Sequence, residues 1–241
     1  MTDDSARRST AAAIGSARGD GVRIVVVHGG GPMIAQALTT AGLSSRFVRG
    51  RRVTEQQAIA VIEAALTLLG KRLAQEIGDA VGLTGRDSAL LRATVADPEL
   101  GRVGTITEVN AAALDRLLAA GFTPVLACLA CDDRDEPLNV NADEVAAAVA
   151  GALKAPVAFL TDVPGVLDDP ADPGSLLATL SAAEAGDRIA DGRIGGGMIP
   201  KVESALEALA RGAPSATILD GRRTDVVQDA ILRRSGTRVV P

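Results

Sequence analysis

The chain has 241 residues, of which 47% are hydrophobic, and a formal net charge of -5 at pH 7. This length suits one large α/β domain or two lobes, and without a run of about eighteen apolar residues the chain is predicted to be soluble rather than membrane-bound. The acidic balance and the lack of Trp and Tyr argue against nucleic-acid binding, because phosphate backbones attract basic surfaces and single strands stack on aromatic rings.

The N-terminal segment is polar. It begins with the acidic residues Asp3 and Asp4 and lacks the apolar stretch of a signal peptide, which predicts a cytoplasmic protein. Residues 6–18 are expected to form a short helix that ends at Gly19.

A glycine-rich turn follows the first predicted strand. The β-branched residues from Ile24 to Val27 predict a buried strand within 22–27, Gly29–Gly31 predict a turn, and a helix is expected from Met33. Glycines leave amide N–H groups accessible at a helix N-terminus, where the helix dipole favours a carboxylate or a phosphate. A tight strand-to-helix turn without any ligand is the alternative interpretation.

Positive charge is concentrated in the next loop, and three of its arginines are expected to be merely solvated. The four arginines are Arg46, Arg49, Arg51 and Arg52. Thr54 is the predicted N-cap of a long helix from about residue 56 to residue 77.

The middle of the chain is predicted to alternate short strands and helices. Strands are expected at 80–84 and 90–93, and a hairpin at a sheet edge is expected within 97–109. Asn110 is predicted to cap the helix that follows, and 124–128 is a second predicted buried strand.

The two cysteines, Cys128 and Cys131, form a C-x-x-C pair at the end of that strand. No second pair exists and the only histidine, His28, is distant in sequence, so a zinc site is disfavoured. We expect both cysteines to behave as small hydrophobic residues rather than as a redox pair.

Polar residues then alternate along the chain as Asn139, Asn141 and Asp143. On a strand they would share one face, so two amides and a carboxylate could converge on a single site. Asp143 also suits the N-cap of the helix expected at 144–153.

The C-terminal part continues the same alternation. Pro156–Thr161 predict a third buried strand, whereas 168–174 are too rich in Pro and Asp for regular structure. Gly195–Gly197 precede Lys201 and a helix to about Arg211. The remaining predicted elements are a helix at 181–190 and strands at 216–220 and 237–240. Strands that alternate with helices predict an α/β fold, a three-layer αβα sandwich with a mainly parallel central sheet.

These features together favour phosphoryl transfer. Two glycine turns, an arginine loop, the Asn/Asp segment and a lysine can bind anions, whereas a Ser-His-Asp set, a metal-ligand set and a cysteine nucleophile are not evident. In phosphoryl transfer the protein mainly positions two anions and neutralises the charge that develops. Walker A and protein-kinase glycine motifs are absent, and the missing G-x-G-x-x-G spacing disfavours a dehydrogenase.

Five segments resemble the amino acid kinase family, in its order and at similar spacing. They are Val27–Pro32, Arg52–Thr54, Asn139–Asp143, Leu160–Leu167 and Gly196–Val202. The resemblance is strongest to members that phosphorylate N-acetyl-L-glutamate, and it implies ATP-dependent formation of an acyl phosphate in arginine biosynthesis. A related substrate, such as an aminoadipate derivative, is the alternative.

The resemblance implies roles for the residues of the acceptor site. Backbone amides of Gly30 and Gly31 would bind the acceptor carboxylate and the phosphoryl group, and Arg52 would pair with a substrate carboxylate through two hydrogen bonds. Asn139 would hold the substrate further.

Catalysis and ATP binding are implied for a second set of residues. Asp143 would orient Lys201, which would neutralise the phosphoryl group during transfer. The ATP site would be bordered by Asp162, Val163, Pro164, Gly165, Val166, Leu167, Arg193, Ile194 and Gly195. Mg²⁺ would be held mainly by the nucleotide phosphates, with no metal site on the protein. The acceptor lobe would span 1–155 and the ATP lobe 156–241.

The resemblance breaks at the N-terminus. Family members open with a strand that carries a lysine followed by a glycine pair, and here no lysine precedes Lys71. Either the sequence is truncated, or the protein is a catalytically impaired ligand-binding or regulatory homologue. Truncation is favoured because the other site residues are kept. The N-terminal helix with which arginine-inhibited members form hexamers is also absent, so a homodimer is expected.

Overall fold

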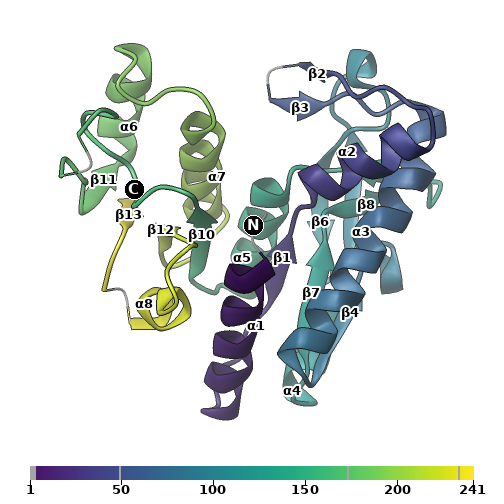
Figure 1. Ribbon diagram of the computed structural model, residues 1–241, viewed down its shortest axis with the longest axis horizontal. Coiled ribbons are helices and arrows are strands. Elements are labelled where there is room, and N and C mark those ends of the chain that lie inside the picture. The colour runs from purple at the N-terminus through teal and green to yellow at the C-terminus, as the bar shows by residue number, and fades with distance from the viewer. Residues whose placement is uncertain (1–3, 49, 173, 233) are drawn as a thin grey trace. The chain divides into compact units, whose positions relative to one another are not determined.

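The computed structural model describes residues 4–48, 50–172, 174–232 and 234–241 (Figure 1). Arg49 and Pro173 of the predicted loops, and Asp3 of the acidic start, lie outside the described residues. Contacts divide the chain into two compact units, which are unit 2 (residues 18–145) and unit 1 (residues 1–17 together with 146–241). Each unit contains at least one sheet of its own.

Helices and strands alternate along most of the chain (Figure 1). The helices are α1 (Asp4–Gly19), α2 (Gly31–Thr40), α3 (Gln56–Ile77), α4 (Ala111–Ala119), α5 (Ala142–Leu153), α6 (Ala182–Ala190), α7 (Met198–Ala210) and α8 (Val226–Leu232). The strands are β1 (Val26–His28), β2 (Phe47–Val48), β3 (Arg51–Arg52), β4 (Ala80–Leu83), β5 (Leu91–Val95), β6 (Gly104–Val109), β7 (Thr123–Ala127), β8 (Leu129–Cys131), β9 (Pro137–Asn139), β10 (Val157–Thr161), β11 (Thr179–Ser181), β12 (Ala216–Asp220) and β13 (Thr237–Val240). Short 3-10 helices lie at Asp87–Ala89 and Pro98–Leu100.

A parallel sheet of three strands forms the centre of unit 2. The strand β7 lies between β1 and β4, pairs in parallel with both, and is buried along its whole length. Helix α3 packs on β4 and β7, and α2 packs on α3 (Figure 1). The carboxyl ends of the strands, at His28, Ala127 and Leu83, therefore lie at one edge of this sheet, which is the edge where α/β folds bind ligands.

The helix–strand packing in this unit is unusually close at one point. A methyl group on Gly82 of β4 would lie 2.7 Å from backbone atoms of Gly70 in α3, so a side chain at position 82 would push the helix away. Glycine at this position therefore lets α3 pack closely against the sheet.

A second sheet in unit 2 has the order β6-β5-β8-β9. The predicted hairpin within 97–109 is wrong in its pairing, because β6 pairs antiparallel with β5, with Leu91 opposite Val109. The edge position expected for this segment is confirmed. The predicted cap is confirmed as well, since the Asn110 side chain accepts a hydrogen bond from the Ala113 amide at 3.2 Å.

Unit 1 contains a mixed sheet with the order β10-β12-β13-β11. Strands β10 and β12 are parallel, as are β11 and β13, whereas β12 and β13 are antiparallel. The prediction of a fully buried strand at 156–161 is wrong, because β10 is an edge strand on which Phe159 is buried while Ala158 and Leu160 are exposed. Small aliphatic side chains from α5, α6 and α7 pack around Phe159 in the core.

The predicted helices of unit 1 are confirmed, and α6 begins with a capping box formed by Ser181 and Glu184. Helix α8 and strand β11 were not predicted. Among the described residues no helix has both the length and the apolar character needed to cross a membrane. The predicted α/β class with parallel strand pairing is confirmed.

Candidate active site

The glycine turn lies between β1 and α2 as predicted. Gly30 is the N-cap of α2, no side chain caps the helix, and the first helical hydrogen bond runs from the Ile34 amide to the Gly30 carbonyl at 2.8 Å. A methyl group on Gly30 would lie 2.7 Å from Cδ2 of Leu66 in α3, so a side chain here would displace this buried leucine. The turn therefore presents an uncapped helix N-terminus, which suits an anion.

The N-terminus of α5 lies against the same turn. A methyl group on Gly29 would be 3.5 Å from Cβ of Ala142, the first residue of α5. Asn141 caps this helix, because its side-chain oxygen accepts a hydrogen bond from the Asp143 amide at 2.8 Å. Asp143 is thus the second residue of α5, next to Ala142, which lies against the glycine turn.

Two predictions for this segment are wrong. Asp143 is not the N-cap of α5, and the alternating residues do not share one strand face, because β9 ends at Asn139 and the helix begins at Ala142. The alternating polar residues did not indicate a strand here because Asn and Asp are also common at the starts of helices.

Asp143 also influences a buried cysteine at the end of β7. Burial, and in smaller part the negative charge of Asp143, raises the pKa of the Cys128 thiol to about 12. Cys131 is buried as well, and burial likewise raises its pKa. Both side chains are buried, as expected for small hydrophobic residues, and their raised pKa values favour the thiol form near neutral pH.

Arg52 faces the glycine turn. Its Nη2 donates to the Gly31 carbonyl at 3.2 Å and its Nη1 donates to the Ser45 hydroxyl. The guanidinium lies over the Phe47 ring at 4.5 Å, and burial lowers its pKa without removing its charge. The structure therefore places a positive charge beside the N-terminus of α2, and the role that the family resemblance implies for Arg52 stays a prediction.

Thr54 connects Arg52 to Asn139. The Asn139 side-chain amide donates to the Thr54 hydroxyl at 3.1 Å, and this hydroxyl donates to the Arg52 carbonyl at 3.1 Å. Thr54 is fully buried, and the N-cap of α3 is Glu55 rather than the predicted Thr54. The predicted capping role of this threonine is wrong, and its contacts with Arg52 and Asn139 were not predicted. Its place two residues after Arg52, in the Arg52–Thr54 motif, was the available signal.

The arginine loop is less solvated than expected. Nη2 of Arg51 lies 3.3 Å from Oε2 of Glu144 in α5, and Oε1 of Glu144 accepts from the Ile106 amide at 3.1 Å. The β2–β3 hairpin is therefore tied to the start of α5. Gly30, Gly31, Arg52, Asn139 and Asp143, five of the predicted residues, gather in one region of unit 2.

The segment Asp162–Leu167, which is predicted to border ATP, is hydrogen-bonded to Thr237 of β13. The Val166 amide donates to the Thr237 hydroxyl at 2.8 Å, and that hydroxyl donates to the Leu177 carbonyl at 2.6 Å. Gly165 has φ of 155°, and a methyl group there would lie 2.7 Å from the same hydroxyl. Thr237 was not predicted as a supporting residue, and no local sequence signal marks it.

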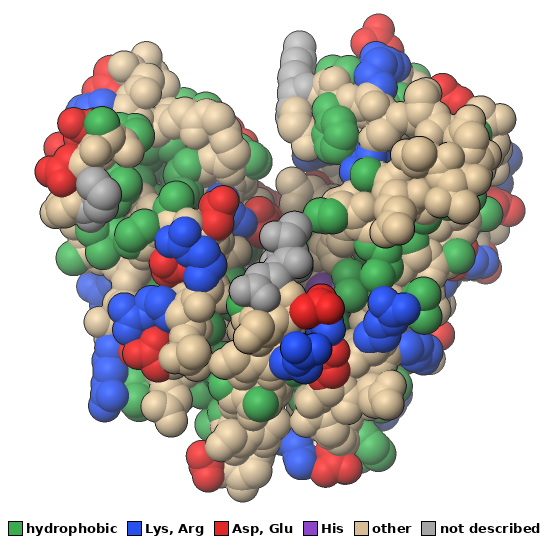
Figure 2. Space-filling view, in the orientation of Figure 1, with side chains coloured by type: hydrophobic (Ala, Val, Ile, Leu, Met, Phe, Trp, Pro, Cys, Tyr) green, Lys and Arg blue, Asp and Glu red, His purple; other side chains and the backbone are tan. Residues whose placement is uncertain are grey.

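The second ATP-border segment meets the first within unit 1. Nη1 of Arg193 lies 3.1 Å from Oδ1 of Asp168, and its Nη2 lies 2.6 Å from Oδ2 of Asp191, which is the main reason why the pKa of Arg193 is raised. Val166 and Ile194 are buried in the same hydrophobic core. On the face drawn in Figure 2, acidic and basic side chains stand beside each other in several small groups.

Lys201 lies in the first turn of α7, directly after a second glycine turn. Gly196 has a φ of 54°, the left-handed conformation that glycine adopts without strain. Lys201 belongs to unit 1 and Asp143 to unit 2, so their predicted interaction stays a prediction.

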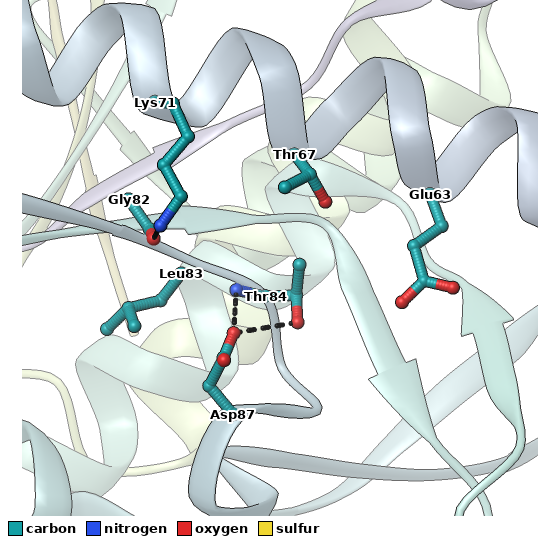
Figure 3. A pocket seen from close by; sticks show the side chains of 7 residues that line it. All are labelled: Glu63, Thr67, Lys71, Gly82, Leu83, Thr84 and Asp87. Carbon is teal, nitrogen blue, oxygen red and sulfur yellow. Dashed lines mark hydrogen bonds between the residues drawn. The ribbon is translucent and has the colours of Figure 1, made fainter.

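A polar pocket of about 230 Å³ between α3 and β4 contains the first lysine of the chain (Figure 3). Lys71 donates through Nζ to the Gly82 carbonyl at 2.7 Å, and the Asp87 carboxylate accepts from the Thr84 amide at 2.7 Å and from its hydroxyl at 2.9 Å. The Lys71 ammonium is thus fixed on β4, which β7 separates from β1 and the glycine turn.

Comparison with known proteins gives a consistent result. The amino acid kinase family model matches residues 1–220. The chain is 53% identical over 235 residues to an acetylglutamate kinase of Deinococcus radiodurans, covering 98% of this chain and 94% of that protein. It is 50% identical to an acetylglutamate kinase of Thermus thermophilus, covering 89% and 87%. The crystal structure of smu.665 from Streptococcus mutans is 28% identical, with a TM-score of 0.81 and coverage of 95% and 91%.

Proposed function

This chain belongs to the amino acid kinase family, and from that premise we propose that it transfers a phosphoryl group from ATP to the side-chain carboxylate of N-acetyl-L-glutamate. The product would be an acyl phosphate for arginine biosynthesis. The names of the relatives from Deinococcus radiodurans and Thermus thermophilus support this substrate, and the polar residues around the glycine turn support an anionic acceptor.

The acceptor would be held by the group that contains Gly30, Gly31, Arg52 and Asn139. Arg52 already lies at hydrogen-bond distance from the Gly31 carbonyl, so a carboxylate that binds the guanidinium would also lie near the N-terminus of α2. Asn139 would add an amide contact, with its orientation set by Thr54. These contacts would bind the substrate carboxylates and orient one of them for attack.

In the reaction, an oxygen of the acceptor carboxylate would attack the γ-phosphorus of ATP as the bond from that phosphorus to the ADP oxygen breaks. The Gly30 and Gly31 amides and the Lys201 ammonium would stabilise the charge on the transferring group. Asp143 would orient Lys201. No proton transfer is required, because the attacking carboxylate is already ionised near neutral pH.

ATP would be bordered by Asp162–Leu167 and Arg193–Gly195, which meet within unit 1. Among the described residues no group of three His, Cys, Asp or Glu side chains is arranged to hold a metal ion. We propose that a Mg²⁺ ion is bound mainly by the nucleotide phosphates, as the chemistry of this ion favours. We assign acceptor binding to a lobe of residues 1–155 and ATP binding to a lobe of residues 156–241.

We also propose that the protein is a cytoplasmic homodimer. The outer face of α3 supports self-association, because Leu68 is 51% exposed there and the small residues Ala60 and Ala64 are exposed on the preceding turns. Sedimentation velocity would test the dimer, and a monomer at micromolar concentration would contradict it.

The observation that best supports the proposed function is the contact between Arg52 and Gly31, because a cation beside an uncapped helix N-terminus suits an anionic acceptor. A coupled ADP-release assay should show turnover with N-acetyl-L-glutamate and much weaker turnover with L-glutamate, N-acetyl-L-aspartate and N-acetyl-L-2-aminoadipate. Calorimetric binding of N-acetyl-L-glutamate without turnover would instead indicate a ligand-binding homologue. Preferred turnover of the aminoadipate derivative would show that this derivative is the substrate. If the protein neither binds nor turns over N-acetyl-L-glutamate, the proposal is refuted.

A further inference from the structure

His28 is the only histidine of the chain and lies where β1 ends and the glycine turn begins. Its side chain is buried, and its Nδ1 lies 2.9 Å from the carbonyl oxygen of Gly29. Its Nε2 is buried and has no hydrogen-bond partner among the described residues. The ring therefore makes one polar contact, and that contact is with the backbone of the glycine turn.

The contact fixes the protonation of the ring. A carbonyl oxygen only accepts hydrogen bonds, so Nδ1 must carry a proton, and in the neutral ring Nε2 carries none. A methyl group on Gly70 of α3 would lie 3.0 Å from Nε2, which shows how closely this helix covers the unprotonated nitrogen. A charged ring would bury a second N–H donor here without an acceptor, which is costly.

The same contact fixes the amide of the next residue. The Gly29 carbonyl and the Gly30 N–H belong to one trans peptide, so they lie in one plane and point in opposite directions. A peptide between two glycines can rotate readily, because neither residue has a side chain to restrict it. A side chain on Gly30 would displace Leu66 of α3, so replacing that glycine would disturb the helix packing as well as the turn.

We propose that His28 is a positioning residue for the transfer reaction. Its Nδ1–H holds the Gly29 carbonyl, and the Gly30 N–H is thereby aimed away from the ring toward the anion bound at the α2 N-terminus. The proposal rests on the proposed function. His28 touches neither substrate nor nucleotide and acts only through the Gly29–Gly30 peptide.

A pair of substitutions tests this role. In His28→Asn the side-chain amide nitrogen occupies about the position of Nδ1 and can still donate to Gly29, whereas in His28→Gln it occupies about the position of Nε2 and cannot. Loss of one preorganised donor costs about 10²- to 10³-fold in kcat. Because the Gly30 amide is released rather than removed, we expect a loss of roughly 10- to 100-fold for His28→Gln, mainly in kcat, and a loss of a few-fold for His28→Asn.

Thr123→Val is the matched control. Thr123 is a buried polar residue at the start of β7, at the end of the strand away from the glycine turn, and its hydroxyl has no partner among the described residues. The activity of the Thr123→Val variant should equal that of the unsubstituted protein. Equal activity of His28→Asn and His28→Gln would overturn the proposal, and their ratio remains informative if both variants are less stable.

The ring itself can be observed independently of turnover. With a single histidine, ¹⁵N-histidine labelling gives one pair of ring nitrogens in the NMR spectrum, and we expect a protonated Nδ1 and a bare Nε2. A ring protonated at Nε2 alone would overturn the proposal. If the unsubstituted protein does not turn over N-acetyl-L-glutamate, the proposed function fails and the positioning role fails with it. If it does and the two variants match, only the role of His28 fails.

Discussion

Replacing Thr54 with valine should weaken both the fold and the acceptor site. The substitution preserves the shape of a fully buried side chain and removes its hydroxyl, which accepts from Asn139 and donates to the Arg52 carbonyl. A buried polar group left without a partner costs about 1–3 kcal/mol, and the Asn139 amide loses its acceptor while the carbonyl loses a donor. The free energy of unfolding should therefore fall by about 2–6 kcal/mol.

Urea denaturation would measure this loss, with Thr94→Val on the exposed face of β5 as the matched control that should change stability by no more than about 0.5 kcal/mol. The double variant Thr54→Val/Asn139→Leu should lose less than the sum of the single variants, because replacing both partners removes the unsatisfied groups. The KM for N-acetyl-L-glutamate should rise in Thr54→Val. If Thr54→Val is as stable as Thr94→Val, the hydroxyl does not connect Arg52 to Asn139 and the reasoning is refuted.

Three further predictions concern other contacts. Arg52→Lys should raise the KM for N-acetyl-L-glutamate by about tenfold or more in the ADP-release assay, because lysine cannot reproduce a two-pronged contact, and an unchanged KM would remove Arg52 from the site. Burial lowers the pKa of His28 below 6.5, so the unfolded chain binds more protons and the protein should lose stability as the pH falls through 6.5. Between pH 7.5 and 5.5 this loss is at most about 1.4 kcal/mol relative to His28→Asn, and parallel pH profiles of the two proteins in urea denaturation would contradict it. Thr237→Val should raise the KM for ATP, because the Val166 amide loses its acceptor beneath the predicted nucleotide segment, whereas an unchanged KM would show that this segment does not border ATP.

The local part of the site could be predicted from the sequence. The glycine turn needs only a strand, three glycines and a helix start in succession, and each of these has a strong local signal. The family resemblance implied that Arg52 and the glycine turn serve the same acceptor, and the structure has the Arg52 guanidinium 3.2 Å from the Gly31 carbonyl.

The part that depends on distant partners could not be predicted. A threonine before a helix is a common N-cap, and only Asn139, 85 positions along the chain, shows that the Thr54 hydroxyl has another partner. Likewise, the apolar run at 157–161 predicts a buried strand, whereas its edge position depends on the strand order of the whole sheet. The role of His28 depends on the direction of the Gly29 carbonyl group, which cannot be predicted from the residues of the motif.

The most direct test of the account is chemical trapping of the product. Incubating the protein with MgATP, N-acetyl-L-glutamate and hydroxylamine should give the hydroxamate of the side-chain carboxylate, identified by mass spectrometry, in amounts equal to the ADP released. Arg52→Lys should reduce both amounts together. ADP release without any hydroxamate would show that the acceptor carboxylate is not phosphorylated, and it would contradict the assignment of the Gly30–Gly31 turn as the acceptor half of a kinase site.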